Sequence, residues 1–149
     1  MSMNGDARPA GMTLQVPVGD IKAGRHFYAT LFGRDPDFEP HDDFLEWRVL
    51  PGVELWWQVV GMTEAFQPLT TRVRLRVDDV RAAARRAESR LGVTTAPVTT
   101  LPGVVRFTDF DDPWGNRLGY YEDIVPSDEQ REPGGSAHDE QMFEVDGNS

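Results

Sequence analysis

Side chains that could bind a small molecule recur at alternate positions in several short segments. Arginine occupies every second position from Arg72 to Arg76, and Glu54, Trp56 and Gln58 alternate with apolar residues in the same way. Guanidinium groups can hold a carboxylate or phosphate by paired hydrogen bonds, and indole rings can stack on a flat ligand. Because alternation with a period of two places residues on one face of a β-strand, the pattern predicts sheet faces suited to a small-molecule site.

Acid–base chemistry would need a titratable group in such a site, and Glu54, Glu46 and Tyr121 are the candidates. A carboxylate beside arginines and tryptophans can be tuned for proton transfer. Covalent catalysis has less support, because the chain contains no cysteine and no serine lies in a Gly-x-Ser-x-Gly motif. The absence of cysteine also excludes disulfides and zinc–thiolate sites.

The three histidines do not form a recognisable metal site. His26 falls within a predicted helix, His41 in a loop beside two aspartates, and His138 in the C-terminal tail. They share no ligand spacing. We interpret His26 as a helix surface residue and the segment around His41 as a solvated turn.

Composition favours a globular domain whose acidity is concentrated at one end. The 149 residues are 39% hydrophobic, and no apolar run approaches the roughly 20 residues that a membrane span requires. Residues 123–149 carry eight acids and one base, so they account for −7 of the formal net charge of −10. The remainder has no basic patch, which argues against a nucleic-acid partner. The polar first 11 residues contain no secretion signal, so a cytoplasmic protein is the default expectation.

An internal repeat determines the expected fold. With an offset of 59 residues, residues 14–21 match residues 73–80. Each copy shows an alternating strand, an aspartate suited to capping a helix (Asp20 and Asp79), and a helical stretch closed by glycine. The helices are predicted over Ile21–Phe32 and Val80–Leu91.

Short β segments complete each copy, giving the order βαβββ twice. We expect them over residues 37–39, 44–50, 53–60, 93–98, 104–110 and 117–122. One domain, residues 12–124, then comprises module one (12–60), a linker (61–71) and module two (72–124). Residues 1–11 are expected to be flexible, and the acidic residues 125–149 to form a flexible or loosely docked tail, or a segment that docks on a partner.

Three motifs accompany the repeat: a Val-x-Asp joint between strand and helix, Phe27-Tyr28 in the first helix, and the turn Asp112-Pro113-Trp114-Gly115-Asn116 before the last strand. In combination they resemble the vicinal-oxygen-chelate superfamily of glyoxalases, extradiol dioxygenases, fosfomycin-modifying enzymes and bleomycin-resistance proteins. The resemblance covers residues 12–122. It implies an α+β fold in which two βαβββ modules form a cup-shaped mixed sheet, with the helices on the outside and small ligands inside. Such a fold alone leaves the function open.

The resemblance also implies where a metal would bind, and those positions lack good ligands. Members that bind a divalent metal use side chains from the first and last strands of each module. Here three of these positions read Thr13, Arg72 and Gly119. The fourth lies within residues 53–60, with Glu54, Trp56 or Gln58 as candidates, so at best one ligand remains. Threonine is a poor ligand, glycine has no side chain, and arginine is a permanent cation. We therefore expect no metal and no other cofactor, with Gly119 leaving room where enzymes place a glutamate.

Strand alternation assigns a set of residues to the inside of the cup. The predicted ligand-binding residues are Gln15, Trp47, Trp56, Gln58, Arg72, Arg74, Arg117 and Tyr121. This set assumes that Trp56 rather than Trp57 faces inward, and that Trp47 and Trp114 lie at the rim. An interpretation of equal weight makes the tryptophans core or dimer contacts. For the arginines we favour a solvated sheet face whose charge is offset by Glu46 and Glu54.

The sequence favours a metal-independent binding protein over an enzyme. The resemblance is strongest to the bleomycin-resistance branch, which implies a homodimer that sequesters or carries an aromatic or amphipathic small molecule. The first alternative is a lyase, isomerase or epimerase that uses a carboxylate of the cup. The second is a module that docks on a partner through its acidic tail.

Overall fold

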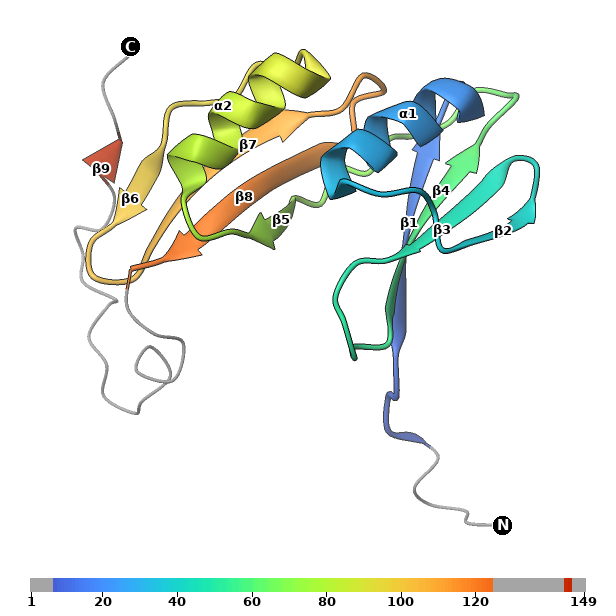
Figure 1. Cartoon of the computed structure of the whole chain (residues 1–149), viewed down its shortest axis with the longest axis horizontal. Coiled ribbons are helices and arrows are strands. Elements are labelled where there is room, and N and C mark those ends of the chain that lie inside the picture. Colours follow the sequence, from blue (N-terminus) through green and yellow to red (C-terminus); the bar gives the residue numbers. More distant parts are fainter. Residues whose placement is uncertain (1–6, 125–143, 146–149) are drawn as a thin grey trace. The chain divides into compact units, whose positions relative to one another are not determined.

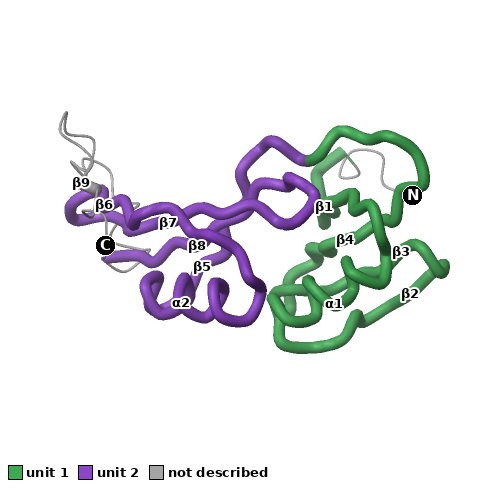
Figure 2. The backbone as a smooth tube through the Cα atoms, turned by 90° about the horizontal axis from the view of Figure 1, so that it is seen from above, with its two compact units in different colours: residues 1–68 green, residues 69–149 purple. Residues whose placement is uncertain are grey.

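The chain divides into two compact units, each with one mixed β-sheet and one helix (Figure 1, Figure 2). The computed structural model describes residues 7–124 and 144–145; unit 1 spans residues 1–68 and unit 2 residues 69–149. No helix among the described residues is long and apolar enough to cross a membrane. The elements of unit 1 are β1 (Met12–Val18), α1 (Ile21–Phe32), β2 (Phe38–His41), β3 (Phe44–Arg48) and β4 (Leu55–Gly61). Those of unit 2 are β5 (Val73–Arg76), α2 (Val80–Leu91), β6 (Thr99–Leu101), β7 (Val105–Asp111), β8 (Arg117–Asp123) and β9 (Glu144–Val145).

The two sheets repeat one strand arrangement. The order is β1-β4-β3-β2 in unit 1 and β5-β8-β7-β6-β9 in unit 2. β1 runs parallel to β4, and β5 runs parallel to β8, whereas the other neighbours are antiparallel. The strand before each helix therefore lies beside the last strand of its βαβββ set. This arrangement confirms the predicted α+β fold with two βαβββ modules.

Both helices begin and end where the sequence predicts. The Asp20 carboxylate accepts hydrogen bonds from the N–H groups of Lys22 and Ala23, and Asp79 caps α2 in the same way. Such caps satisfy N–H groups that have no partner within the helix. Each helix is followed by a glycine in the left-handed region, with φ of 76° after α1 and 71° after α2. A side chain is disfavoured there, which explains why each helix stops at glycine.

Aromatic residues form the core of unit 1. The ring of Tyr28 on α1 lies 6.4 Å from that of Trp47 and 5.8 Å from that of Trp57, both on the sheet. Phe32 approaches the same two tryptophans. Trp47 is completely buried, and Trp57 is 3% exposed. Large aromatic surfaces removed from water stabilise this helix–sheet contact strongly.

Smaller side chains join helix and sheet in unit 2. α2 buries Val80, Ala84 and Ala87, and the sheet below it buries Leu118 and Tyr120. Burial raises the pKa of the Tyr120 hydroxyl above its ordinary value, although nearby Arg86 opposes the shift. Unit 2 therefore has the same layers as unit 1 with less aromatic volume between them.

Two of the predicted segments differ in the structure. The strand expected over residues 93–98 is wrong: these residues are not in a strand, and β6 begins at Thr99. Thr95 instead donates its N–H and hydroxyl to Glu88 of α2, and Pro97 has no N–H to offer a neighbouring strand. In the acidic tail, Glu144 and Val145 pair with β6 as the fifth strand, β9. The rest of the predicted tail, residues 125–143 and 146–149, and residues 1–6 at the N-terminus lie outside the described residues.

Candidate ligand-binding face

The face of the unit 1 sheet opposite α1, here called the open face of unit 1, carries three rows of side chains. The neighbours of these residues within the strands, among them Val16, Leu45 and Val59, are buried on the α1 side. Strand register places one residue of β1, one of β4 and one of β3 in each row. The rows are Thr13, Trp56 and Arg48; Gln15, Gln58 and Glu46; and Pro17, Val60 and Phe44.

Hydrogen bonds link the middle row across all three strands. Gln15 Nε2 donates to Gln58 Oε1 at 3.3 Å, and Gln58 Nε2 donates to Glu46 Oε1 at 3.0 Å. Glu46 is partly buried, and within residues 7–124 no cationic side chain forms an ion pair with it. The row therefore ends in a carboxylate that retains hydrogen-bond capacity.

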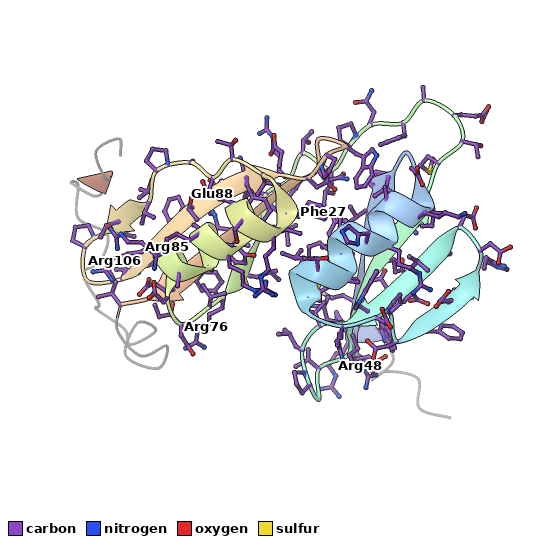
Figure 3. The ribbon with its side chains drawn as sticks, turned by 45° about the horizontal axis from the view of Figure 1, so that its top comes forward. Phe27, Arg48, Arg76, Arg85, Glu88 and Arg106 are labelled. Carbon is purple, nitrogen blue, oxygen red and sulfur yellow. The ribbon has the colours of Figure 1, made fainter. Side chains whose placement is uncertain are left out.

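Two charged neighbours hold Trp56 in place. Its indole Nε1 donates to Glu54 Oε2 at 3.0 Å, and the Arg48 guanidinium lies 5.0 Å from the centre of its ring. Arg48, labelled in Figure 3, also forms an ion pair with Glu54. These contacts hold the half-buried indole ring in one orientation on the sheet. Glu54 is occupied by these contacts.

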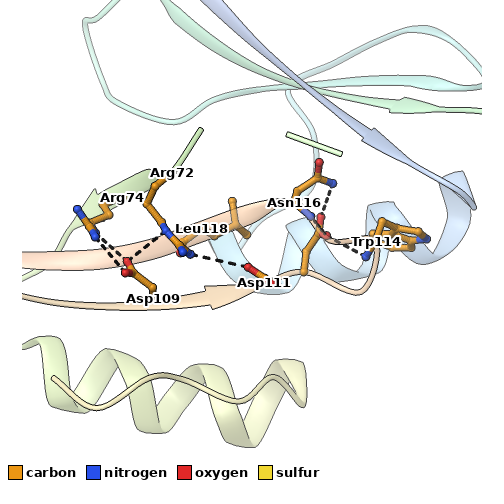
Figure 4. A network of polar contacts seen from close by, with 8 residues as sticks. Arg72, Arg74, Asp109, Asp111, Trp114, Asn116 and Leu118 are labelled. Carbon is orange, nitrogen blue, oxygen red and sulfur yellow. Dashed lines mark hydrogen bonds and ion pairs between the residues drawn. The ribbon is translucent and has the colours of Figure 1, made fainter. Parts of the chain in front are cut away.

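The corresponding face of the unit 2 sheet, opposite α2, is ionic. Arg74 forms two hydrogen bonds to the Asp109 carboxylate, at 2.8 and 3.0 Å, and its guanidinium lies 4.1 Å from the centre of the Phe107 ring. Arg72 lies 3.7 Å from Asp109 and 3.8 Å from Asp111, and donates to the Leu118 carbonyl at 3.1 Å. Figure 4 shows this network.

Aspartates of unit 2 therefore pair with three arginines of this face, whereas Arg117 lies exposed at the start of β8. Arg76 pairs with Asp123 at 3.2 Å, which completes the set. The expectation that Glu46 and Glu54 offset these arginines is wrong, because the carboxylates paired with them are those of Asp109, Asp111 and Asp123.

Gly119 lies beneath the Arg74–Asp109 pair. A Cβ atom at this glycine would lie 2.6 Å from Asp109 Oδ1 and 2.6 Å from the Thr108 carbonyl oxygen. The expectation that Gly119 leaves room is wrong, because the ion pair fills that space. The glycine is required so that Arg74 and Asp109 can meet across β8.

Several solved structures are similar to this chain in fold and, more weakly, in sequence. No family model and no curated protein matches the chain. A glyoxalase/bleomycin resistance protein from Catenulispora acidiphila shares 29% identity at a TM-score of 0.61, covering 79% of this chain and all of that one. The antibiotic-binding protein TnmS3 from a Streptomyces species shares 27% at 0.63, covering 78% and 98%. These neighbours are consistent with the vicinal-oxygen-chelate superfamily. A lactoylglutathione lyase from Agrobacterium tumefaciens, at 15% identity, TM-score 0.58 and coverage of 77% and 94%, shares the fold alone.

The residues at the superfamily's metal positions do not fit a divalent ion. In unit 1 the first and last strands pair Thr13 with Trp56 and Gln15 with Gln58, none of which is a carboxylate or imidazole. In unit 2 Gly119 pairs with Arg74, a cation. Within residues 7–124 and 144–145, no group of three or more histidines, cysteines or acids is placed to hold a metal. Divalent ions need several anionic or imidazole ligands, which this donor set does not supply.

Most of the predicted ligand residues lie on the sheet face opposite the helix of their unit, but one does not. Gln15, Trp56 and Gln58 lie together on that of unit 1, whereas Trp57 lies in the core, as expected. Trp47 is the exception: it lies between sheet and helix, where its Nε1 donates to the Arg34 carbonyl at 2.9 Å, so its predicted position at the rim is wrong. Apolar packing on Tyr28 and Phe32 determines its side of β3.

The predicted residues of unit 2 lie on its sheet in a different setting. Arg72 and Arg74 are ion-paired, Tyr121 lies between Arg76 and Phe107 in register, and Arg117 lies exposed at the start of β8. His26 and His41 are exposed, in agreement with their interpretation as surface residues, and His138 lies outside the described residues.

Sequence reasoning missed Arg48 and Asp109. Both act through partners on other strands, Trp56 in one case and Arg74 in the other. Alternation along one strand gives the face of a side chain, but only strand register gives its neighbour.

Proposed function

We propose that this protein is a metal-independent, cytoplasmic binding protein that holds an aromatic or amphipathic small molecule against the open face of unit 1. The observation that carries the proposal is Trp56, a flat ring fixed by Arg48 and Glu54 beside the hydrogen-bonding amides of Gln58 and Gln15. Apolar surface with a few placed polar groups is typical of small-molecule sites. The antibiotic-binding protein TnmS3, at 27% identity, supports the same class of function.

Binding would be stoichiometric capture in which no bond is made or broken. The ligand ring stacks on the side of the Trp56 indole away from Arg48, and polar groups of the ligand exchange hydrogen bonds with the middle row. A homodimer is part of the proposal, and light scattering of the purified protein measures it directly.

Titration of the chelator-treated protein tests the function. Tryptophan fluorescence is followed against a panel of aromatic antibiotics and small aromatic acids, with mass spectrometry of every mixture. Quenching with the ligand recovered unchanged is the expected result. Chemical conversion of any compound, or affinity that appears only with added divalent metal, would contradict the proposal.

A matched pair of variants locates the site. Trp56→Ala should weaken affinity about tenfold or more, measured by calorimetry, because it removes the stacking surface. Met12→Ala removes an apolar side chain that is 63% exposed and lies on the other face of the sheet, so it should leave affinity unchanged. Equal loss in both variants would place binding elsewhere.

The two alternatives have separate tests. An enzyme of the lyase, isomerase or epimerase class would use Glu46, because Glu54 is held by Arg48 and Trp56, and mass spectrometry would detect its product. A docking role for the acidic tail predicts that deletion of residues 125–149 abolishes partner binding and leaves small-molecule binding intact.

A further inference from the structure

Glu46 and Asp109 occupy equivalent positions in the two units. In unit 1 strand register aligns Gln15, Gln58 and Glu46, and in unit 2 it aligns the corresponding residues of β5, β8 and β7. Those residues are Arg74, Gly119 and Asp109. Each row thus begins on the strand before the helix and ends in a carboxylate.

The middle residue of each row determines which side chain contacts the carboxylate at the end of the row. In unit 2 the absence of a side chain at Gly119 lets Arg74 cross β8 and bind Asp109 with two hydrogen bonds. In unit 1 the side chain of Gln58 fills the equivalent space, and Gln15 carries no charge. Glu46 consequently receives one hydrogen bond from an amide where Asp109 receives a guanidinium.

A partly buried carboxylate with a single neutral donor favours a cation. Burial removes part of the water that would otherwise solvate Glu46, and an ionised carboxylate can accept up to about four hydrogen bonds. Arg48, two residues along β3, pairs with Glu54 through its Nη2 atom, and its buried Nε has no hydrogen-bond partner. Among the described residues, the charge of Glu46 therefore has no counter-ion.

Apolar and aromatic side chains flank Glu46 on the open face. Trp56 lies one row away on the neighbouring strand, within the reach of diagonal cross-strand contacts, and Phe44 and Val60 form the row on the other side. A positive group bound to Glu46 would therefore lie beside a ring that can also attract it through its π face.

We propose that Glu46 binds the protonated nitrogen of an aromatic amine whose ring lies against Trp56. This inference rests on the proposed function and adds the charge of the ligand: cationic compounds are selected over neutral and anionic compounds of the same shape.

Three probes that share a naphthalene ring and carry substituents of different charge test it: 2-(aminomethyl)naphthalene, 2-naphthalenemethanol and 2-naphthoate, titrated by calorimetry into the full chain with chelator near neutral pH. The amine should bind about tenfold more tightly than the alcohol, the factor expected of one charge-assisted hydrogen bond of modest strength. The naphthoate should bind more weakly than both. The preference for the amine should shrink with added salt.

Three variants assign the preference to Glu46. Glu46→Gln should remove the preference, so that the amine and the alcohol bind with similar affinity. The double variant Gln15→Arg/Gln58→Gly rebuilds the unit 2 row in unit 1 and should abolish the same preference by pairing Glu46 internally. Glu39→Gln is the matched control, because Glu39 lies on β2 and pairs with Arg25 of α1. It removes the same charge and should leave the preference intact.

The outcomes separate this inference from the proposed function. Equal affinity of the native protein for all three probes overturns the selection of cations and leaves aromatic binding standing. Retention of the preference in Glu46→Gln also overturns the inference. If none of the three probes binds and no compound of the antibiotic panel binds either, both proposals fail.

Discussion

The two units share a fold and differ in the chemistry of the same sheet face. In unit 1 the face carries a fixed indole, a chain of amides and a carboxylate without a counter-ion among residues 7–124. In unit 2 it carries arginines that are already paired with aspartates. Sheet topology determines which positions face each other, but two substitutions, glutamine for arginine and glutamine for glycine, decide whether a carboxylate there is neutralised. Two modules of the same fold can therefore differ at one position: the carboxylate of one module is paired with an arginine, and the equivalent carboxylate of the other module is not.

The first prediction contrasts the two faces of the unit 1 sheet and has the largest expected effect. Trp47→Ala should lower the free energy of unfolding by about 3–5 kcal/mol, because it empties a fully buried site against Tyr28 and Phe32. Trp56→Ala, on the open face, should cost much less. Chemical denaturation with urea measures both. Similar losses of stability in the two variants would mean that Trp56 contributes to the core as much as Trp47 does.

The second prediction concerns the middle residue of each row. Gly119→Ala should destabilise the protein by about 1–3 kcal/mol, because the new Cβ meets the Thr108 carbonyl and the Asp109 carboxylate. Gln58→Ala keeps a Cβ that the backbone already accommodates and should cost about 1 kcal/mol or less, the value of its hydrogen bonds. A tolerated alanine at position 119 would disprove the close approach across β8. Urea unfolding of the two variants measures the difference.

The third prediction compares the equivalent carboxylates. Asp109→Asn removes a partner of Arg74 and Arg72 and should cost about 1 kcal/mol, reduced at high salt because these side chains are partly exposed. Glu46→Gln removes no ion pair and should change stability by less than about 0.5 kcal/mol. Thermal unfolding at low and high salt gives both values. A larger loss for Glu46→Gln would show that its charge is already compensated.

The smallest effect is a pH dependence in unit 2. Hydrogen bonds from the Thr95 hydroxyl and N–H lower the pKa of Glu88, which lies on α2 and is labelled in Figure 3. A carboxyl whose pKa is lower in the folded state stabilises the fold above its unfolded pKa, and that contribution disappears as the pH falls through the folded value. Thr95→Val should therefore reduce stability near neutral pH by less than Asp109→Asn does, and the difference in stability from the native protein should disappear in acid. Unfolding curves between neutral and acidic pH measure the gap, and a gap independent of pH would contradict the assignment.

Local signals in the sequence are sufficient for the modules and for part of the site. Asp20 and Asp79 with the glycines after each helix give both helices, and alternation puts Trp56 and Gln58 on the open face. Residues 93–98 look like a strand from their β-branched content, but contacts with Glu88 and a proline override that propensity.

The remaining features depend on residues far apart in the chain. Arg74 and Asp109 are 35 positions apart, and the sequence around either residue does not predict that they pair. Trp47 is assigned to the core by aromatic packing from α1, which alternation alone does not reveal. The open face of unit 1 and the corresponding face of unit 2 differ in which side chains pair across strands, and the residue pattern of a single strand does not show this difference.

The most direct test of the account is the response of individual side chains to an aromatic amine. Nitrogen-15-labelled protein with chelator is titrated with 2-(aminomethyl)naphthalene, and the tryptophan indole and glutamine amide resonances are followed by NMR. The account predicts that the signals of Trp56, Gln58 and Gln15 shift together, whereas those of Trp47 and Trp57 move little. Shifts confined to the arginine side chains of unit 2, or shifts that appear only after a divalent metal is added, would contradict it.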